Sequence, residues 1–153
     1  MTTAKPVPDG RQAVTPYLIV KDAARAIEFY RTAFAAREIF RLTEPTGKIG
    51  HAELDIHGSL LMLADEYPDF GALSPASIGG SPVSIHLYVE DVDRVVDVAT
   101  SAGATLLRPV KDEFYGDRTG MIADPFGHKW HISTRKEDVS PQEMQKRWSA
   151  MFS

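Results

Sequence analysis

The chain has 153 residues and a formal net charge of −4, which suits one globular domain and offers no basic face for a nucleic-acid backbone. It has no apolar run of the roughly 18 to 20 residues that a membrane helix needs, and its first residues lack the apolar core of a signal peptide. We therefore expect a cytoplasmic protein that binds neither nucleic acid nor a membrane. Because the sequence contains no cysteine, any metal site must be built from histidine, carboxylate and water.

The first part of the chain, residues 14–64, predicts one strand, one helix and three further strands. The polar residues 1–13 contain Pro and Gly and no apolar run, so we expect a flexible tail there. Asp22 is suited to cap a helix, because an apolar stripe at three- and four-residue spacing follows it: Ala26, Ile27, Tyr30, Ala33 and Phe34. Strands are predicted over residues 14–20, 37–42, 49–56 and 59–64.

The second part of the chain, residues 83–134, repeats this order. A strand is followed by a helix that Asp91 caps and Gly103 ends, and then by three more strands, so that the strands cover residues 83–89, 105–109, 119–123 and 128–134. Several residues recur at an offset of 69: Leu18 with Leu87, Val20 with Val89, Asp22 with Asp91 and Ala33 with Ala102. The sequence thus predicts an α+β fold of two paired β-α-β-β-β modules whose curled mixed sheets surround a cavity.

Two further segments complete the predicted organisation of a single domain over residues 14–138. Residues 65–82 are rich in Pro, Gly and Ser and are predicted to form a long loop between the modules. Residues 139–153 predict a C-terminal helix, with Ser140 as its N-cap and an apolar stripe of Met144, Trp148 and Met151. This stripe either packs on this chain or a sister subunit, or closes a pocket as a lid.

Strand alternation selects the residues that can carry chemistry. In strand 49–56 the apolar Ala52, Leu54 and Ile56 face one side, so His51 and Glu53 face the other, as do His86 and His131 in the second module. Such faces either meet solvent or line a shared polar pocket. Aromatic residues and one arginine are candidates for the walls of that pocket: Tyr17, Tyr88, Phe114 and Arg118. Arg118 either binds an anionic group or forms a salt bridge with an acidic side chain of this chain.

The stretch 114–134 carries a more specific pattern. It reads Tyr115-Gly116-Asp117-Arg118-x-Gly120 and then Asp124-Pro125-Phe126-Gly127-His128-x-Trp130, in which Asp124 to Gly127 have the composition of a type I turn. Together with TPYLIVKDAARAIEFY, HAELDI and HLYVEDVD, this pattern resembles the PhnB-like branch of the vicinal oxygen chelate superfamily, which includes glyoxalases, bleomycin-resistance proteins and dioxygenases. The resemblance implies the paired-module fold and a homodimer. The family usually has Gly where this chain has Ala35, and a left-handed helix end there costs Ala about 1 kcal/mol.

The resemblance also implies a place for a divalent ion such as Zn, Ni, Mn or Fe(II). In metal-using members the ligands come from the first strand and a later strand of each module, and the matching positions here are Thr15, Glu53, Ser84 and His131. Glu53 and His131 suit a metal, whereas the two hydroxyl groups are poor ligands. A displaced site would use His51, Glu53, His86 and His131. The alternative is that Glu53 and His131 form a hydrogen-bonded pair at the bottom of a metal-free pocket.

Two functions follow from the resemblance and stay open at this point. The first is a small-molecule-binding protein of the glyoxalase/bleomycin-resistance type, whose ligand the sequence does not specify. The second is a metal-dependent lyase, isomerase or dioxygenase, in which Glu53 and His131 hold the ion and His86 or His51 acts as third ligand or general base.

Overall fold

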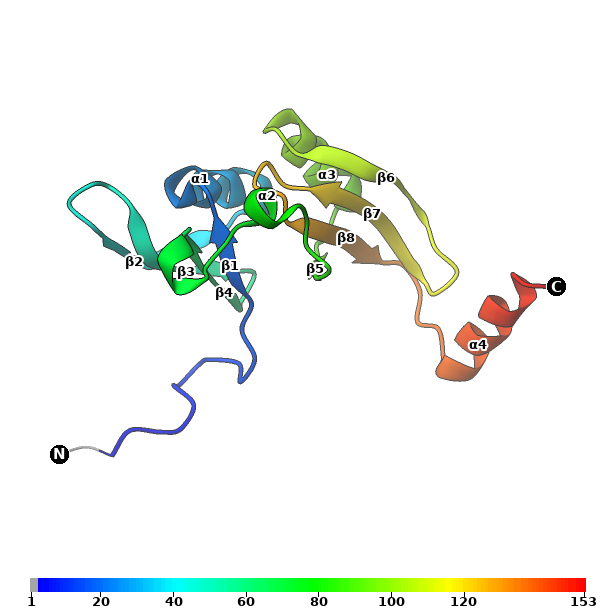
Figure 1. Cartoon of the computed structure of the whole chain (residues 1–153). Helices are drawn as coiled ribbons and strands as arrows, with labels where there is room; N and C mark the ends of the chain where they lie inside the picture. The colour runs from blue at the N-terminus through cyan, green and yellow to red at the C-terminus, as the bar shows by residue number, and fades with distance from the viewer. Residues whose placement is uncertain (1–2) are drawn as a thin grey trace. The chain divides into compact units, whose positions relative to one another are not determined.

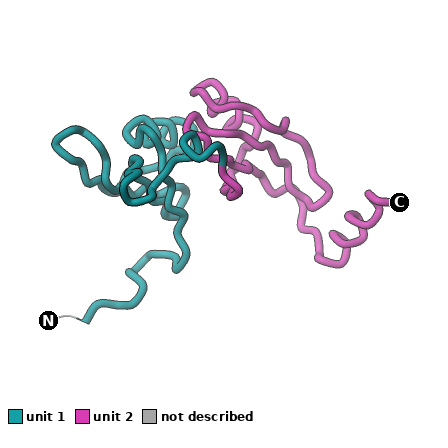
Figure 2. The backbone as a smooth tube through the Cα atoms, viewed as in Figure 1, with its two compact units in different colours: residues 1–80 teal, residues 81–153 magenta. Residues whose placement is uncertain are grey.

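The computed structural model describes residues 3–153 and divides after Gly80 into two compact units, called unit 1 and unit 2 here (Figures 1 and 2). Each unit contains a four-stranded mixed sheet with a helix on one face, and a further helix follows at the C-terminal end of the chain. The predicted α+β fold with two β-α-β-β-β modules is therefore confirmed. Among the described residues, no helix combines the length and apolar character needed to cross a membrane.

Unit 1 has the strand order β1-β4-β3-β2, with β1 parallel to β4 and the other neighbours antiparallel. Its elements are β1 (Tyr17–Val20), α1 (Ala23–Phe34), β2 (Arg37–Thr43), β3 (Ile49–Ile56) and β4 (Ser59–Asp65). The whole predicted stripe of α1 is buried, and it faces the buried apolar residues of the sheet, among them Ile49, Ala52, Leu54, Ile56 and Leu63. The opposite face of the sheet carries the polar and aromatic Tyr17, His51 and Glu53 beside apolar side chains of β4, such as Met62, which pairs with Tyr17 and Glu53.

Unit 2 has the equivalent order β5-β8-β7-β6, with β5 parallel to β8. Its elements are β5 (Ser84–Tyr88), α3 (Val92–Ser101), β6 (Thr105–Asp112), β7 (Asp117–Ala123) and β8 (Lys129–Arg135). Val92, Val96 and Ala99 of α3 are buried together with Ile122, Trp130 and Ile132 of the sheet. Strands β6 and β7 are longer than predicted, because the segment Glu113–Gly116 forms a tight turn between them.

The two units share their helix-start chemistry as well as their topology. Asp22 and Asp91 each accept a hydrogen bond at 3.2 Å from the backbone N–H three residues later. The first helical N–H of α1 donates to Asp65 and that of α3 donates to Thr134, at 2.8 and 2.9 Å. Asp65 and Thr134 are again 69 positions apart, so the repeat extends to the side chains that hold each helix on its sheet.

The helix ends differ between the units. Ala35 follows α1 with φ 55°, so the left-handed helix end expected there is confirmed. Alanine has a Cβ, which makes this conformation less favourable than it would be for glycine. After α3 the left-handed position is taken by Gly103, with φ 115°. A substitution at either residue therefore tests the same backbone requirement from opposite directions.

Two segments outside the sheets, 65–82 and the N-terminal segment, have local structure or contacts of their own. The connection 65–82 contains a 3₁₀ turn, Pro68–Phe70, and a short helix, α2 (Pro75–Ile78), capped by Ser74. The predicted flexible tail begins with residues 1 and 2, which lie outside the described residues, but its Arg11 and Gln12 contact the sheet of unit 1.

The C-terminal helix α4 (Pro141–Ala150) is capped by Ser140 as predicted, and it touches the β6–β7 turn through Trp148 and Phe114, whose ring centroids lie 5.7 Å apart. Trp148 and Met151 nevertheless remain 47% and 60% exposed, so most of the predicted apolar stripe is uncovered.

Candidate functional site

The free face of unit 1 carries a connected row of four polar side chains. Because residues two apart in a strand point to the same side, β3 places His51 and Glu53 together, with His51 Nε2 2.9 Å from Glu53 Oε2. The Tyr17 hydroxyl lies 2.7 Å from His51 Nδ1, and Arg11 Nη1 lies 2.7 Å from Glu53 Oε1. Phe40 lies beside the row, its ring centroid 5.6 Å from that of His51.

Glu53 is the buried centre of this row, with a side chain only 7% exposed. Burial raises the pKa of Glu53, but the hydrogen bond with His51 and the ion pair with Arg11 outweigh it and hold that pKa below its ordinary value. Because an ionised carboxylate only accepts, His51 Nε2–H donates to Glu53, and in the neutral imidazole Nδ1 then accepts from the Tyr17 hydroxyl. Burial and the charge of Glu53 both raise the pKa of Tyr17.

The free face of unit 2 carries an aromatic cluster, here called the platform, made of His86, Tyr88 and His131. The rings of His86 and Tyr88 are stacked, with centroids 4.7 Å apart and planes 21° from parallel. His131 pairs with His86 across the parallel strands β5 and β8, and their ring centroids lie 5.8 Å apart. Tyr88 is 53% exposed, so the platform presents ring surface that no side chain of unit 2 covers.

Polar groups behind the platform fix its side chains. His86 Nε2 lies 2.7 Å from the Ser133 hydroxyl, which lies 2.8 Å from that of Thr119, and both hydroxyl-bearing residues are buried. The Tyr88 hydroxyl donates to the buried Asp117 at 2.9 Å. This hydrogen bond, together with burial, raises the pKa of Tyr88. The platform is therefore held in one arrangement before any ligand arrives.

Burial lowers the pKa of His131, and the neighbouring His86 and Arg108 lower it further. The lowered pKa favours the neutral form of the His131 imidazole at pH 7. A neutral imidazole offers a ring face together with one donor and one acceptor nitrogen.

Of the predicted pocket residues, Tyr17 belongs to unit 1, and two residues of unit 2, Arg118 and Phe114, lie away from the platform. Arg118 alternates with Thr119 along β7, so it points to the face that α3 covers, where it pairs with Asp93 at 2.8 Å and with Asp112 at 3.2 Å. Of the two interpretations left open for Arg118, the structure shows the salt bridge. Phe114 packs against Tyr115 and Trp148, and its carbonyl accepts from Arg147, so it belongs to the contact with α4.

Sequence reasoning missed several members of these faces. Ser133 is two residues after His131, and Thr119 pairs with Ser133, so alternation places both on the face of His131. The sequence does not show, however, which group a buried hydroxyl binds. Arg11 gave no signal, since it lies in a polar segment 42 positions before Glu53.

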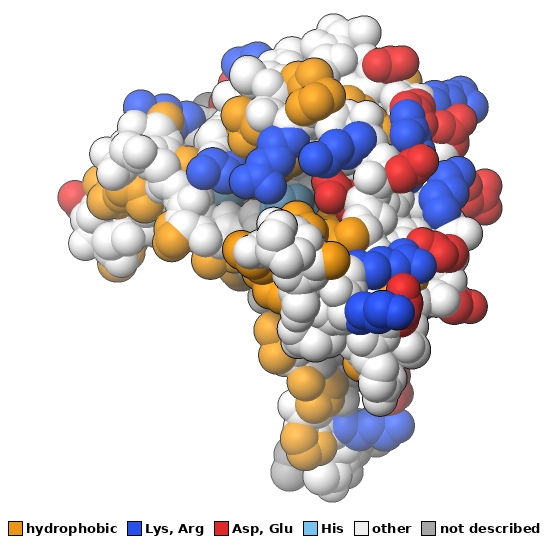
Figure 3. All heavy atoms as spheres, turned by 90° about the vertical axis from the view of Figure 1, so that its right-hand side faces the viewer, with side chains coloured by type: hydrophobic (Ala, Val, Ile, Leu, Met, Phe, Trp, Pro, Cys, Tyr) orange, Lys and Arg blue, Asp and Glu red, His pale blue; other side chains and the backbone are white. Residues whose placement is uncertain are grey.

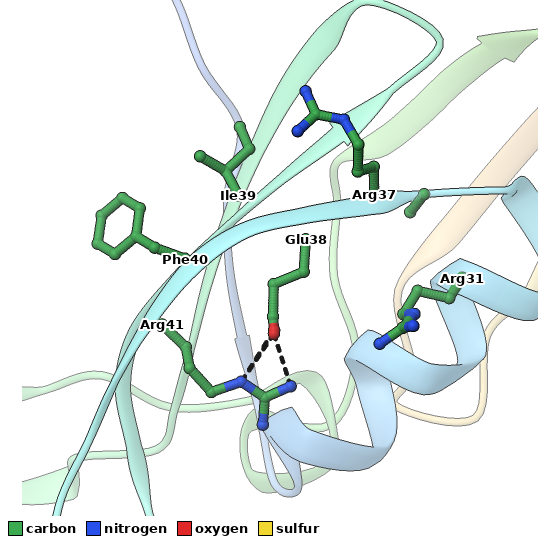
Figure 4. Close-up of a pocket in the computed structure, with 7 residues that line it drawn as sticks. Arg31, Arg37, Glu38, Ile39, Phe40 and Arg41 are labelled. Atoms are coloured by element: carbon green, nitrogen blue, oxygen red, sulfur yellow. Dashed lines mark hydrogen bonds and ion pairs between the residues drawn. The ribbon is translucent and has the colours of Figure 1, made fainter.

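A groove of about 480 Å³ beside β2 contains three arginines but does not qualify as the site (Figure 4). Arg41 pairs with Glu38 within the groove, at 2.7 Å. Arg31 pairs with Glu28 and Arg37 with Asp55, both at 3.2 Å. Each guanidinium group already has a carboxylate partner, so the groove offers little net attraction to an anion. In the view of Figure 3, basic and acidic side chains alternate along the right-hand side, whereas Lys and Arg side chains gather beside the histidines at the centre.

The comparisons with known proteins agree with the fold. The model of the "Glyoxalase/Bleomycin resistance protein/Dioxygenase superfamily" matches residues 12–132. The chain belongs to this superfamily. An uncharacterized protein of Mycobacterium tuberculosis H37Rv is 44% identical over 141 residues, which cover 90% of this chain and 83% of that protein.

Two solved structures of similar proteins extend the comparison. TioX from Micromonospora sp. ML1 is 27% identical with a TM-score of 0.63, covering 81% of this chain and 98% of that one. A PhnB protein from Bacillus cereus is 19% identical with a TM-score of 0.64, covering 80% and 99%, and shows likeness of fold alone.

The side chains do not fit the metal site that the superfamily suggests. Glu53 Oε2 hydrogen-bonds with His51, whereas the buried Oε1 has no hydrogen-bond partner and is neutralised by the ion pair with Arg11 at 2.7 Å. Within either unit, over residues 3–80 or 81–153, no group of three or more His, Asp or Glu side chains is arranged to hold a metal ion. The matching positions Thr15 and Ser84 supply only neutral hydroxyl groups. We therefore derive no chemical step through a metal for this superfamily member.

Proposed function

We propose that this chain is a small-molecule-binding protein of the glyoxalase/bleomycin-resistance type whose platform in unit 2 takes a planar ligand. The observation that carries the proposal is the stacked, half-exposed pair of His86 and Tyr88 on a sheet face that α3 leaves free. Aromatic side chains contribute large contact areas, and offset stacking adds about 0.5 to 1.5 kcal/mol beyond burial. A planar molecule gains most from such a surface.

The chemistry behind the platform supports a neutral polar ligand over a charged one. The lowered pKa of His131 favours its neutral imidazole, and the Ser133 hydroxyl is bound to both His86 and Thr119. Asp117 is used by Tyr88. Ligand sites combine a mainly apolar or aromatic wall with a few fixed polar groups that set orientation, and the platform has this composition.

The experiment measures binding of planar probes by isothermal titration. The probes are 2-naphthol, indole and adenine, with cyclohexanol as a non-planar control, and we expect a planar probe to bind. Tyr88→Leu should weaken its affinity about 5- to 10-fold, the equivalent of roughly 1 kcal/mol of stacking. Phe70→Leu, in an exposed loop of unit 1, serves as the matched control and should bind as the wild type does. Equal affinity for cyclohexanol, or no effect of Tyr88→Leu, would refute a planar site.

Metal dependence separates this proposal from the alternative of a metal-dependent lyase, isomerase or dioxygenase. The alternative requires that Glu53→Gln and His131→Ala abolish uptake of Zn, Ni, Mn or Fe(II), and that EDTA abolish ligand binding. The binding proposal expects probe affinity to be the same with and without EDTA. In the alternative, His86 or His51 would serve as third metal ligand or general base.

We also propose finer assignments for this superfamily member. The PhnB-like branch is supported by the motif from Tyr115 to Trp130 and by the fold likeness to the Bacillus cereus PhnB protein.

A homodimer is supported by exposed apolar side chains on two elements, Leu106 and Leu107 of β6 and Trp148 and Met151 at α4. Light scattering should give twice the mass of one chain, and a monomer at all concentrations would refute the dimer. We also propose a cytoplasmic location, which cell fractionation tests.

A further inference from the structure

The carboxylate of Glu53 already has a positive partner supplied by the chain itself. Arg11 Nη1 lies 2.7 Å from Oε1, and His51 Nε2 lies 2.9 Å from Oε2. The side chain of Glu53 is 7% exposed and that of Arg11 is 28% exposed, so the pair is largely shielded from water. A charge in such a place is costly without a counter-ion, because water no longer solvates it.

The segment that carries Arg11 is fastened to unit 1 on its other side as well. The Gln12 side chain accepts from the backbone N–H of Leu60 at 3.3 Å and donates to its carbonyl at 2.8 Å. The Arg11 backbone N–H donates to the Pro8 carbonyl at 3.2 Å, which closes a turn just before it. These contacts set the position of Arg11 against β3 independently of its own side chain.

We infer that Arg11 is the resident cation of Glu53 and excludes a divalent metal ion from this carboxylate. A metal ion would approach Glu53 Oε1 where the guanidinium group now lies, and it would meet a like charge there. His51, the neighbouring nitrogen ligand, already shares its two ring nitrogens between Glu53 and Tyr17. The inference concerns unit 1 alone and does not depend on the platform of unit 2.

The inference predicts that removing Arg11 creates affinity for a metal ion. In Arg11→Met the buried carboxylate keeps His51 beside it but loses its cation, so a divalent ion becomes the favourable replacement. We expect Arg11→Met to bind Zn²⁺ or Ni²⁺ at least 10-fold more tightly than the wild type, and the bound ion to raise its unfolding temperature. Arg11→Lys keeps the positive charge and should gain no metal affinity.

The experiment uses full-length protein stripped with EDTA and dialysed free of it, with isothermal titration and thermal unfolding in Zn²⁺, Ni²⁺ or Mn²⁺. It compares the wild type with Arg11→Met, Arg11→Lys, Glu53→Gln and the double variant Arg11→Met/Glu53→Gln. Lys5→Met, in the exposed pair with Asp9 of the same segment, is the matched control and should behave as the wild type does. The gained metal affinity should vanish in the double variant, which would assign it to Glu53.

Two outcomes would overturn the inference. The first is that the wild type binds a metal ion and that Glu53→Gln abolishes this binding. This result can be obtained even if Arg11→Met fails to fold. The other is a folded Arg11→Met that binds metal no better than the wild type. Neither result changes the expected effect of Tyr88→Leu on planar probes, so failure of this inference is distinguishable from failure of the proposed function.

Discussion

The free faces of unit 1 and unit 2 rest on the same scaffold but carry different chemistry. Both sheets have one parallel and two antiparallel strand pairs, and both helices start with a capping Asp and a buried acceptor from the last strand of the module. On the free face, however, unit 1 carries the connected row of Tyr17, His51, Glu53 and Arg11. Unit 2 instead presents the stacked rings of the platform.

This difference shows which positions the fold requires and which it leaves free. The first N–H group of each helix needs a side-chain acceptor, so an acceptor recurs at the offset of 69 even though it is Asp65 in unit 1 and Thr134 in unit 2. Side chains on the free face have no such duty. Position 17 is tyrosine in unit 1, and its counterpart 86 is histidine in unit 2, without any change in strand pairing.

The largest expected effect is on the free energy of unfolding and concerns two aspartates at equivalent turns of the two units. The buried Asp124 accepts from the N–H groups of Phe126 and His128 and from the Trp130 indole, each at 2.9 Å. Its counterpart Asp55 accepts at 2.8 Å from the Gly58 N–H group and pairs with an exposed arginine. Asp124→Ala should lower the free energy of unfolding by about 3 kcal/mol and Asp55→Ala by about 1 kcal/mol, because more buried donors lose their acceptor.

Chemical denaturation of both variants measures this difference. If both variants lost the same free energy of unfolding, the two turns would stabilise their units equally. That result would contradict the difference proposed between the units.

The two helix ends give a smaller effect with opposite signs. Ala35→Gly should raise the free energy of unfolding by up to about 1 kcal/mol, because glycine adopts the left-handed conformation without a Cβ clash. Gly103→Ala should lower it by a similar amount, since φ 115° is strained for alanine. Thermal unfolding midpoints of both variants are the measurement, and a destabilised Ala35→Gly would contradict the account.

The smallest effect is spectroscopic and concerns the two exposed tyrosines. The hydrogen bond with Asp117 is the first cause of the raised pKa of Tyr88, whereas burial is the first cause for Tyr17. Asp117→Asn should therefore lower the pKa of Tyr88 and leave that of Tyr17 unchanged, as NMR with ring-labelled tyrosine can measure. An unchanged Tyr88 would mean that Asp117 does not fix the platform.

The same pKa shift has a consequence for stability. The folded protein holds the Tyr88 proton more tightly than the unfolded chain does. This contribution is present below the ordinary tyrosine pKa of about 10 and is lost as the pH rises through the higher folded value. Asp117→Asn should reduce this loss at alkaline pH, which denaturation at several pH values can test.

The sequence was sufficient where the structural cause is local. Alternation in strand 49–56 separated the buried Leu54 from His51, and turn composition located Asp124. It was insufficient where a side chain meets a distant partner. From the sequence alone, Arg118 could bind an anionic ligand or form a salt bridge. The structure decides between them, because Asp93 of α3 lies 2.8 Å from its guanidinium group. Arg11 reaches Glu53 only through the path of a segment that has no periodicity to predict it.

The most direct test of the central claim is a ¹H–¹⁵N and aromatic ¹H–¹³C NMR titration of the whole chain with 2-naphthol. The account predicts that the largest shift changes fall on the platform residues His86, Tyr88 and His131 and on the adjacent backbone of β5 and β8. Shift changes confined to the connected row of unit 1, or spread evenly over both units, would contradict a planar ligand site on the platform.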